Sequence, residues 1–151
     1  MTIVANRLVD AYFTGKTAKK GVVVMIRKLL SFVFITSDDK NIGLLLLRVF
    51  VGIGMLTHGI PKITGGPEFW AGVGGVLTKI GMPGPAVFWG FMAAVAESIG
   101  ALFLVFGAFT TVASFLIVST MTVAAFVAHA GDPFATRELA LLYLFCALFF
   151  M

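Results

Sequence analysis

The stretch NIGLLLLRVFVGIGMLTHGIPK, residues 41–62, decides the fold. It is mostly apolar and has the length that one α-helix needs to cross the hydrocarbon core of a bilayer, about 20 residues. It also carries three ionisable side chains, Arg48, His58 and Lys62. Ionisable groups inside a membrane are costly, and they usually face a partner or a functional cavity. The stretch therefore predicts a membrane helix whose polar groups need partners.

The composition of the whole chain agrees with a membrane protein. Of its 151 residues, 60% are hydrophobic and 12% are charged, whereas soluble domains average about 45–50% apolar and about 25% charged residues. A soluble domain of this length still exposes roughly a third of its unfolded surface, so it could not hide so many apolar side chains. The single cysteine, Cys146, excludes an internal disulfide and argues against a thiol oxidase that works through its own dithiol.

Four apolar segments predict an all-α, integral membrane four-helix bundle over residues 41–151. The predicted spans are residues 41–61, 85–107, 110–130 and 136–151. The last span is short, because 16 residues give roughly 24 Å against a core of about 30 Å. It is either tilted, or the natural chain continues beyond Met151. Between the first two spans, residues 63–84 predict a short amphipathic helix in the opposite interface, starting at Pro67 and Glu68.

The first 40 residues form a separate basic arm. They hold seven Lys or Arg against three acids, whereas residues 41–151 hold four of each. Beside a membrane, such an arm favours contact with anionic lipid and a cytoplasmic N-terminus. It lacks the dense basic run that is typical of nucleic-acid binding. Residues 22–35 are apolar around Arg27 and Lys28, and predict an N-terminal interfacial amphipathic helix, with a fifth span as the alternative.

The deeper charges predict a buried ion pair. At 1.5 Å per residue, Arg48 lies roughly 10 Å, and Glu97 roughly 15 Å, from the inner ends of their helices. An isolated charge at this depth costs several kcal/mol, so we expect Arg48 and Glu97 to pair. A protonated Glu97 in an apolar site is the alternative. Small residues share the helix face of Glu97, which favours either close helix packing or space for a ligand.

A second polar cluster is expected at the outer end of the bundle. His58 and His129 lie roughly 25 and 28 Å along their helices, and Lys62 and Glu138 reach the same level. Three interpretations stay open: anchoring in the interface, a small-molecule site for a quinone-type head group, and metal or haem ligation by the two histidines. No Cys or further His supports the metal site. The four side chains are therefore candidates for ligand binding or proton relay.

The order of these motifs resembles the DoxX family. RVFVGIGMLTHGIPKI is followed by a Gly-rich loop with GMPGP, then by AAVAESIGALFLVFGAFT, TVAAFVAHAGDPF and ELALLYL, over about residues 42–150. The resemblance implies a four-helix bundle in the bacterial cytoplasmic membrane. Related proteins include small membrane subunits of thiosulfate:quinone oxidoreductase, and a mycobacterial member that works with a superoxide dismutase and a sulfurtransferase. The positions that match the family's recurring polar residues are Arg48, His58, Lys62, Glu97 and His129.

One functional hypothesis and one alternative follow. We expect a small inner-membrane subunit or accessory of a redox assembly that contacts a quinone, has no intrinsic cofactor or metal, and receives electrons from a partner. His58 and Lys62 would polarise a quinone oxygen, and His129 or Glu138 would relay protons; whether the chain is itself an enzyme stays open. The alternative is a non-enzymatic structural or assembly subunit of a larger membrane complex, or a lipid-binding module. Membrane lipid and a hetero-complex are the expected partners, with a homo-oligomer as an option and no nucleic acid.

Overall fold

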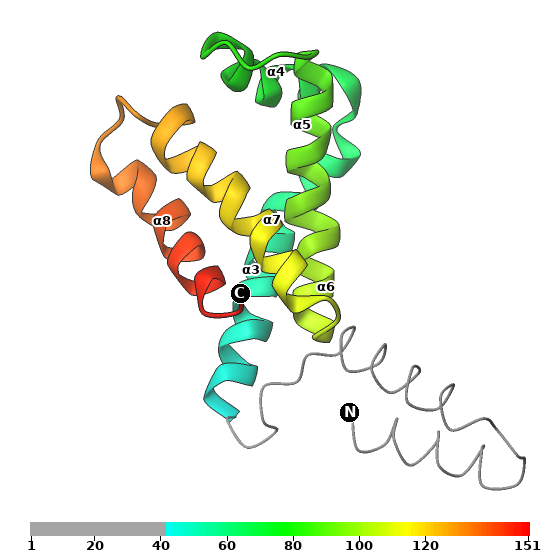
Figure 1. The fold of residues 1–151 in the computed structure, drawn as a ribbon, viewed down its shortest axis with the longest axis vertical. Helices are drawn as coiled ribbons and strands as arrows, with labels where there is room; N and C mark the ends of the chain where they lie inside the picture. Colours follow the sequence, from blue (N-terminus) through cyan, green and yellow to red (C-terminus); the bar gives the residue numbers. More distant parts are fainter. Residues whose placement is uncertain (1–41) are drawn as a thin grey trace, which may run out of the picture.

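The computed structural model describes residues 42–151, so the predictions for the basic arm and for the helix over residues 22–35 lie outside the described residues. The described residues are helical, and no strand occurs among them (Figure 1). Three helices are long and apolar enough to cross a membrane: Ile42–Thr64, Ala86–Phe106 and Thr110–Ala128. These findings confirm an all-α membrane bundle.

The bounds of the helices agree with the predicted spans to within three residues at each end. In chain order the elements are α3 (Ile42–Thr64), α4 (Gly66–Lys79), α5 (Ala86–Val95), η1 (Ala96–Gly100), α6 (Ala101–Phe106), α7 (Thr110–Val123), η2 (Ala124–Ala128) and α8 (Phe134–Leu148). The two elements labelled η are π-helical turns, so that α5–η1–α6 is one continuous helix and α7–η2 is another. The fourth helix, α8, has 15 residues, which is as short as the sequence predicted.

The ends of the helices follow from local chemistry. Pro67 lies in the first turn of α4 and Pro85 directly precedes α5, where the missing amide hydrogen is not needed. Gly107 ends α6 in the left-handed conformation, with φ 70°, which glycine adopts without strain. Phe109, at φ 48°, is the one other described residue between α6 and α7 with a positive φ. Together they form the tight turn that reverses the chain into α7.

Close helix packing depends on glycine at two interfaces. α4 lies against α5, because Gly74 meets the backbone of Ala86 and Gly90 meets the backbone of Trp70. A Cβ atom at either glycine would collide with a carbonyl of the neighbouring helix. The core lies where α3, α6, α7 and α8 meet, and its largest fully buried apolar side chains are Met55, Leu104 and Ile117.

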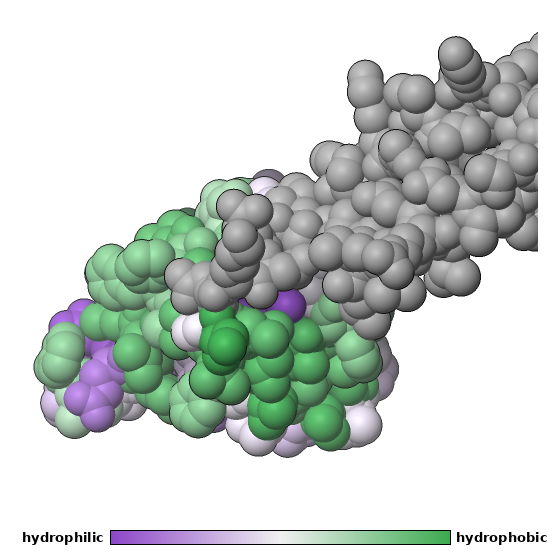
Figure 2. Space-filling model, turned by 90° about the horizontal axis from the view of Figure 1, so that it is seen from below, coloured by the Kyte–Doolittle hydropathy of each residue, from purple (hydrophilic) through white to green (hydrophobic). Residues whose placement is uncertain are grey.

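The outer surface of the bundle is apolar, as expected of a protein surrounded by lipid. Figure 2 shows hydrophobic residues over most of the coloured face. Large side chains point outward from several helices, among them Phe50 (74% exposed), Phe106 (66%) and Phe145 (59%). Exposed apolar area of this extent is unusual for a soluble monomer and ordinary in a bilayer.

Candidate functional site

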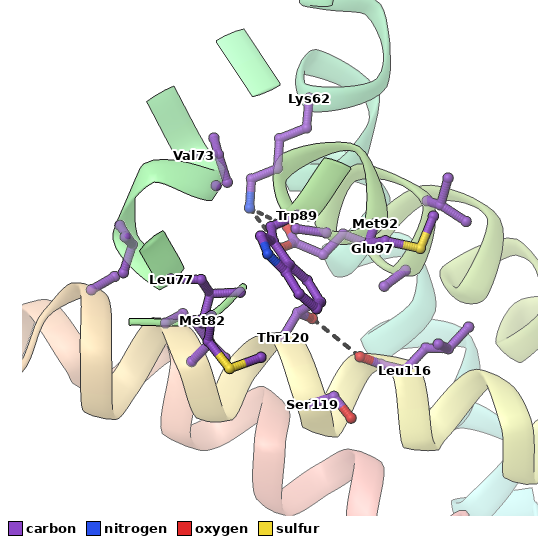
Figure 3. Close-up of a pocket in the computed structure, with 18 of the residues that line it drawn as sticks. Lys62, Val73, Leu77, Met82, Trp89, Met92, Glu97, Leu116, Ser119 and Thr120 are labelled. Carbon is purple, nitrogen blue, oxygen red and sulfur yellow. Dashed lines mark hydrogen bonds and ion pairs between the residues drawn. The ribbon is translucent and has the colours of Figure 1, made fainter. Parts of the chain in front are cut away.

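A cavity of about 510 Å³ lies between α4, α5–η1 and α7–η2 (Figure 3). Its volume is within the range of ligand sites in proteins, about 300–1,000 Å³. Most of its wall is apolar and includes Val73, Leu77, Met82, Trp89, Met92 and Leu116. The polar side chains of the wall are Lys62, Glu97, Ser119, Thr120 and His129. An apolar cavity with a few polar groups is typical of a small-molecule site.

An ion pair between Lys62 and Glu97 forms one part of this wall. The ammonium nitrogen of Lys62 lies 2.6 Å from each carboxylate oxygen of Glu97. The side chain of Glu97 is 3% exposed and that of Lys62 is 25% exposed. Charge-assisted hydrogen bonds of this length are strong, and a buried carboxylate needs such a partner. The pair therefore joins α3 to η1 at the cavity.

The last turn of α3 positions Lys62. Backbone carbonyls in the last turn of a helix have no partner within it, and the indole N–H of Trp70 donates a hydrogen bond of 2.7 Å to the carbonyl of Lys62. The ring of Trp70 packs edge to face against Phe91, with 4.9 Å between centroids. α4 and α5 thus hold the end of α3, and a cation there is also favoured by the helix dipole.

A π-helical turn positions Glu97. Single π-helical turns within α-helices occur frequently at functional sites, and Glu97 is the second residue of η1. Gly59 of α3 packs directly on the backbone carbonyl of Glu97, at a distance that leaves no room for a side chain. The second π-helical turn, η2, supplies Ala124 and Ala128 to the same cavity. Neither turn was predicted from the sequence, although both lie in runs of mostly small residues, AVAESIG and VAAFVAHA.

The structure differs from the predicted pair of Arg48 and Glu97. The guanidinium of Arg48 lies beside Gly107, since a Cβ built there would be 3.0 Å from its central carbon. Arg48 is level with Gly107 at the end of α6, although it lies roughly 9 Å along α3 from Ile42. The inner ends of α3 and α6 are therefore not level. Depths counted from helix ends therefore placed Arg48 too close to Glu97. Arg48 instead lies at the C-terminus of α6, where a cation is favourable, and its Nε is buried without a hydrogen-bond partner.

The structure separates the four residues of the expected outer cluster. Lys62 and His129 line the cavity, whereas His58 and Glu138 are exposed and are not among its lining residues. His129 Nδ1 lies 2.7 Å from a carboxylate oxygen of Asp132. The ring of His58 instead approaches Tyr143 of α8 edge on, with 6.0 Å between centroids. Within residues 42–151, no group of three or more His, Cys, Asp or Glu side chains is placed to hold a metal ion.

The comparison with protein families identifies the chain. A family model described as DoxX matches residues 43–130, more than half of the chain. The chain belongs to the DoxX family. In this DoxX protein the matched region contains every residue that lines the cavity, while α8 lies beyond it. Neither the curated proteins nor the solved structures gave a match to the chain.

Proposed function

We propose that this DoxX protein is a small subunit or accessory of a redox assembly in the bacterial inner membrane, and that it binds a quinone head group in the cavity. The observation that carries the proposal is the Lys62–Glu97 pair in the wall of an otherwise apolar cavity of about 510 Å³. A quinone has the matching chemistry, because it combines polar ring oxygens with an apolar tail. The basic N-terminus would lie in the cytoplasm.

The lining of the cavity suits a flat ring. Figure 3 shows Trp89 in the centre of the view, with Met82 and Met92 on either side. The indole N–H of Trp89 donates to the carbonyl of Pro83 over 3.1 Å, which fixes the orientation of its ring. Aromatic rings stack in offset or edge-to-face arrangements, and methionine adapts its shape to a ligand. A quinone ring beside Trp89 would therefore contact the indole and an adaptable methionine side chain.

Lys62 supplies the polar contact in this proposal. Its ammonium has three N–H donors, and the two oxygens of Glu97 take up two of them at most. The remaining donor can bind a quinone carbonyl. Two electrons from a redox centre of the partner protein, and two protons, would convert the bound quinone to quinol. The exposed His129–Asp132 pair at the cavity wall is the candidate group for exchanging those protons with water.

A second candidate function is a structural or assembly subunit, or a lipid-binding module. It is favoured by α8, whose 15 residues are fewer than the about 20 that a span needs and which exposes the side chains Leu139, Leu142 and Phe145. Helices of a larger membrane complex could cover this face. In that case the cavity would hold a lipid chain and the ion pair would only fix the helices.

Purification from native membranes in mild detergent separates the two functions. All co-purifying proteins and quinones would be quantified by mass spectrometry. A dehydrogenase or sulfurtransferase together with quinone, each in stoichiometric amount, is the result expected of a redox subunit. A stoichiometric machine without redox centres, and no quinone, would contradict the proposal and support the structural role.

A further inference from the structure

The basic side chains that line the cavity are paired with carboxylates. Two basic side chains line it, Lys62 and His129. Each has a carboxylate partner, Glu97 at 2.6 Å and Asp132 at 2.7 Å. No basic side chain of the lining is therefore left to bind an anion alone.

The buried position of Glu97 disfavours binding of a second anion in the cavity. Its carboxylate is almost fully enclosed, whereas its partner Lys62 is partly exposed. A carboxylate or phosphate that approached Lys62 would meet the charge of Glu97 in a poorly screened environment. The positive charge of Lys62 is already compensated by both oxygens of Glu97, so it offers little net attraction to a second anion. An uncharged carbonyl or hydroxyl needs only the remaining N–H donor and leaves the pair intact.

In a bilayer, a site for an uncharged ligand has to discriminate against the surrounding anionic lipids. Phospholipids and fatty acids are amphiphiles with anionic heads, and they surround every cavity that is open to the membrane. An apolar wall distinguishes poorly between one alkyl chain and another, so discrimination among amphiphiles depends mainly on the head group. Like charges placed together at a binding site disfavour the wrong ligand, and specific sites combine such repulsion with attraction to the right one.

We propose that Glu97 makes this cavity selective for amphiphiles with an uncharged, oxygen-bearing head group and excludes those with an anionic head. The proposal rests on the ligand site of the proposed function and names the ligand class of that site. It does not depend on redox chemistry. Glu97 is then a specificity residue, and Lys62 is the donor that contacts the head group.

The test measures equilibrium binding to the full chain reconstituted in phospholipid nanodiscs, with binding to empty nanodiscs subtracted, because a sugar detergent would itself belong to the proposed ligand class. The probes are tritiated hexadecan-2-one, tritiated hexadecanoate and a decyl-substituted benzoquinone. The first two differ in the charge of the head group and share the length of the chain. The variant Glu97→Gln removes the negative charge and keeps the shape of the side chain. The double variant Lys62→Gln with Glu97→Gln removes both charges and serves as the control for disturbed folding.

The wild-type chain is expected to bind the ketone at least about tenfold more tightly than the acid. Glu97→Gln should reverse this preference, because it leaves Lys62 with an unpaired charge. The double variant lacks both the charge of Glu97 and the donor of Lys62, so its preference for the ketone should fall well below that of the wild type. If Glu97→Gln alone fails to fold, the double variant still decides, since a preference for the ketone as large as that of the wild type would contradict the proposal.

The remaining outcomes distinguish this inference from the proposed function. Binding of the ketone without the quinone would refute the quinone function and leave the charge selectivity standing. Equal binding of acid and ketone by the wild type would overturn the selectivity, even if the quinone binds. Absence of saturable binding by all three probes would overturn both.

Discussion

The ammonium of Lys62 lies 2.6 Å from both carboxylate oxygens of Glu97, across the contact between the end of α3 and the π-helical turn η1. The two residues are 35 positions apart in the sequence. Gly59 allows this contact, since its lack of a side chain lets α3 touch the backbone of Glu97. The pair therefore combines two functions: it fixes the register of two membrane helices, and it places a hydrogen-bond donor at an apolar cavity.

Loss of the lysine should destabilise the protein. Lys62→Met would leave the carboxylate of Glu97 buried without a partner, and we expect a loss of about 3 kcal/mol in the free energy of unfolding. Unfolding in mixed SDS micelles, followed by circular dichroism, measures this quantity. Lys79→Met is the matched control, because Lys79 is exposed at the end of α4. An equal, small effect of both substitutions would show that the pair contributes no stability.

The contact at Gly59 gives a second test of the register. Gly59→Ala places a methyl group against the carbonyl of Glu97, and overpacking of this kind costs about 1–3 kcal/mol. Gly72→Ala is the control, since no atom lies within 4 Å of the Cβ that it would add. Alanine favours a helix over glycine by up to about 1 kcal/mol, so Gly72→Ala should be neutral or stabilising. Two stable variants would contradict the close approach of α3 and η1.

Arg48 and Lys62 should differ in their effect on ligand binding. Arg48 lies beside Gly107, at the other end of the bundle from the cavity. We therefore expect Arg48→Gln to bind a decyl-substituted benzoquinone as tightly as the wild type, and Lys62→Gln to bind it at least about tenfold more weakly. Equilibrium binding to the chain in phospholipid nanodiscs measures both. Equal weakening by the two substitutions would place Arg48 at the ligand.

The orientation in the membrane can be measured with single cysteines. In a Cys146→Ala background, Gly72→Cys on α4 should react with a membrane-impermeant maleimide added to intact spheroplasts. Ala108→Cys in the turn between α6 and α7 should react only after permeabilisation. This pattern follows from a cytoplasmic N-terminus and the expected alternation of the spans. The reverse pattern would show that the chain has the opposite orientation.

The sequence predicted the helices well and the site only in part. Apolar length and the residues Pro67, Pro85 and Gly107 located the helix ends, because these signals are local. The partner of Glu97 depends on how two helices are shifted along each other, which no local signal fixes. Counting from helix ends therefore favoured Arg48, whereas the contact with Gly59 selects Lys62.

The π-helical turns help to explain why the position of the cavity was not predicted. A regular period of 3.6 residues describes α5–η1–α6 only up to Val95, and the π-helical turn that follows changes the faces of the residues beyond it. A helical projection grouped the small residues near Glu97 and left close packing and space for a ligand as alternatives, but it could not locate the space between α5–η1 and α7–η2. His58 and His129 likewise share a depth and differ in surroundings, because depth does not specify the face of a helix.

The central claim is that the cavity beside Lys62 and Glu97 binds a quinone, and photolabelling tests it most directly. The full chain would be irradiated with an azidoquinone, with and without an excess of the decyl-substituted benzoquinone, and the labelled residues identified by mass spectrometry. If the quinone binds there, lining residues such as Trp89 and Thr120 should be labelled, and excess quinone should suppress that labelling. Labelling that is confined to outward-facing residues such as Phe145, or that no excess of quinone suppresses, would contradict it.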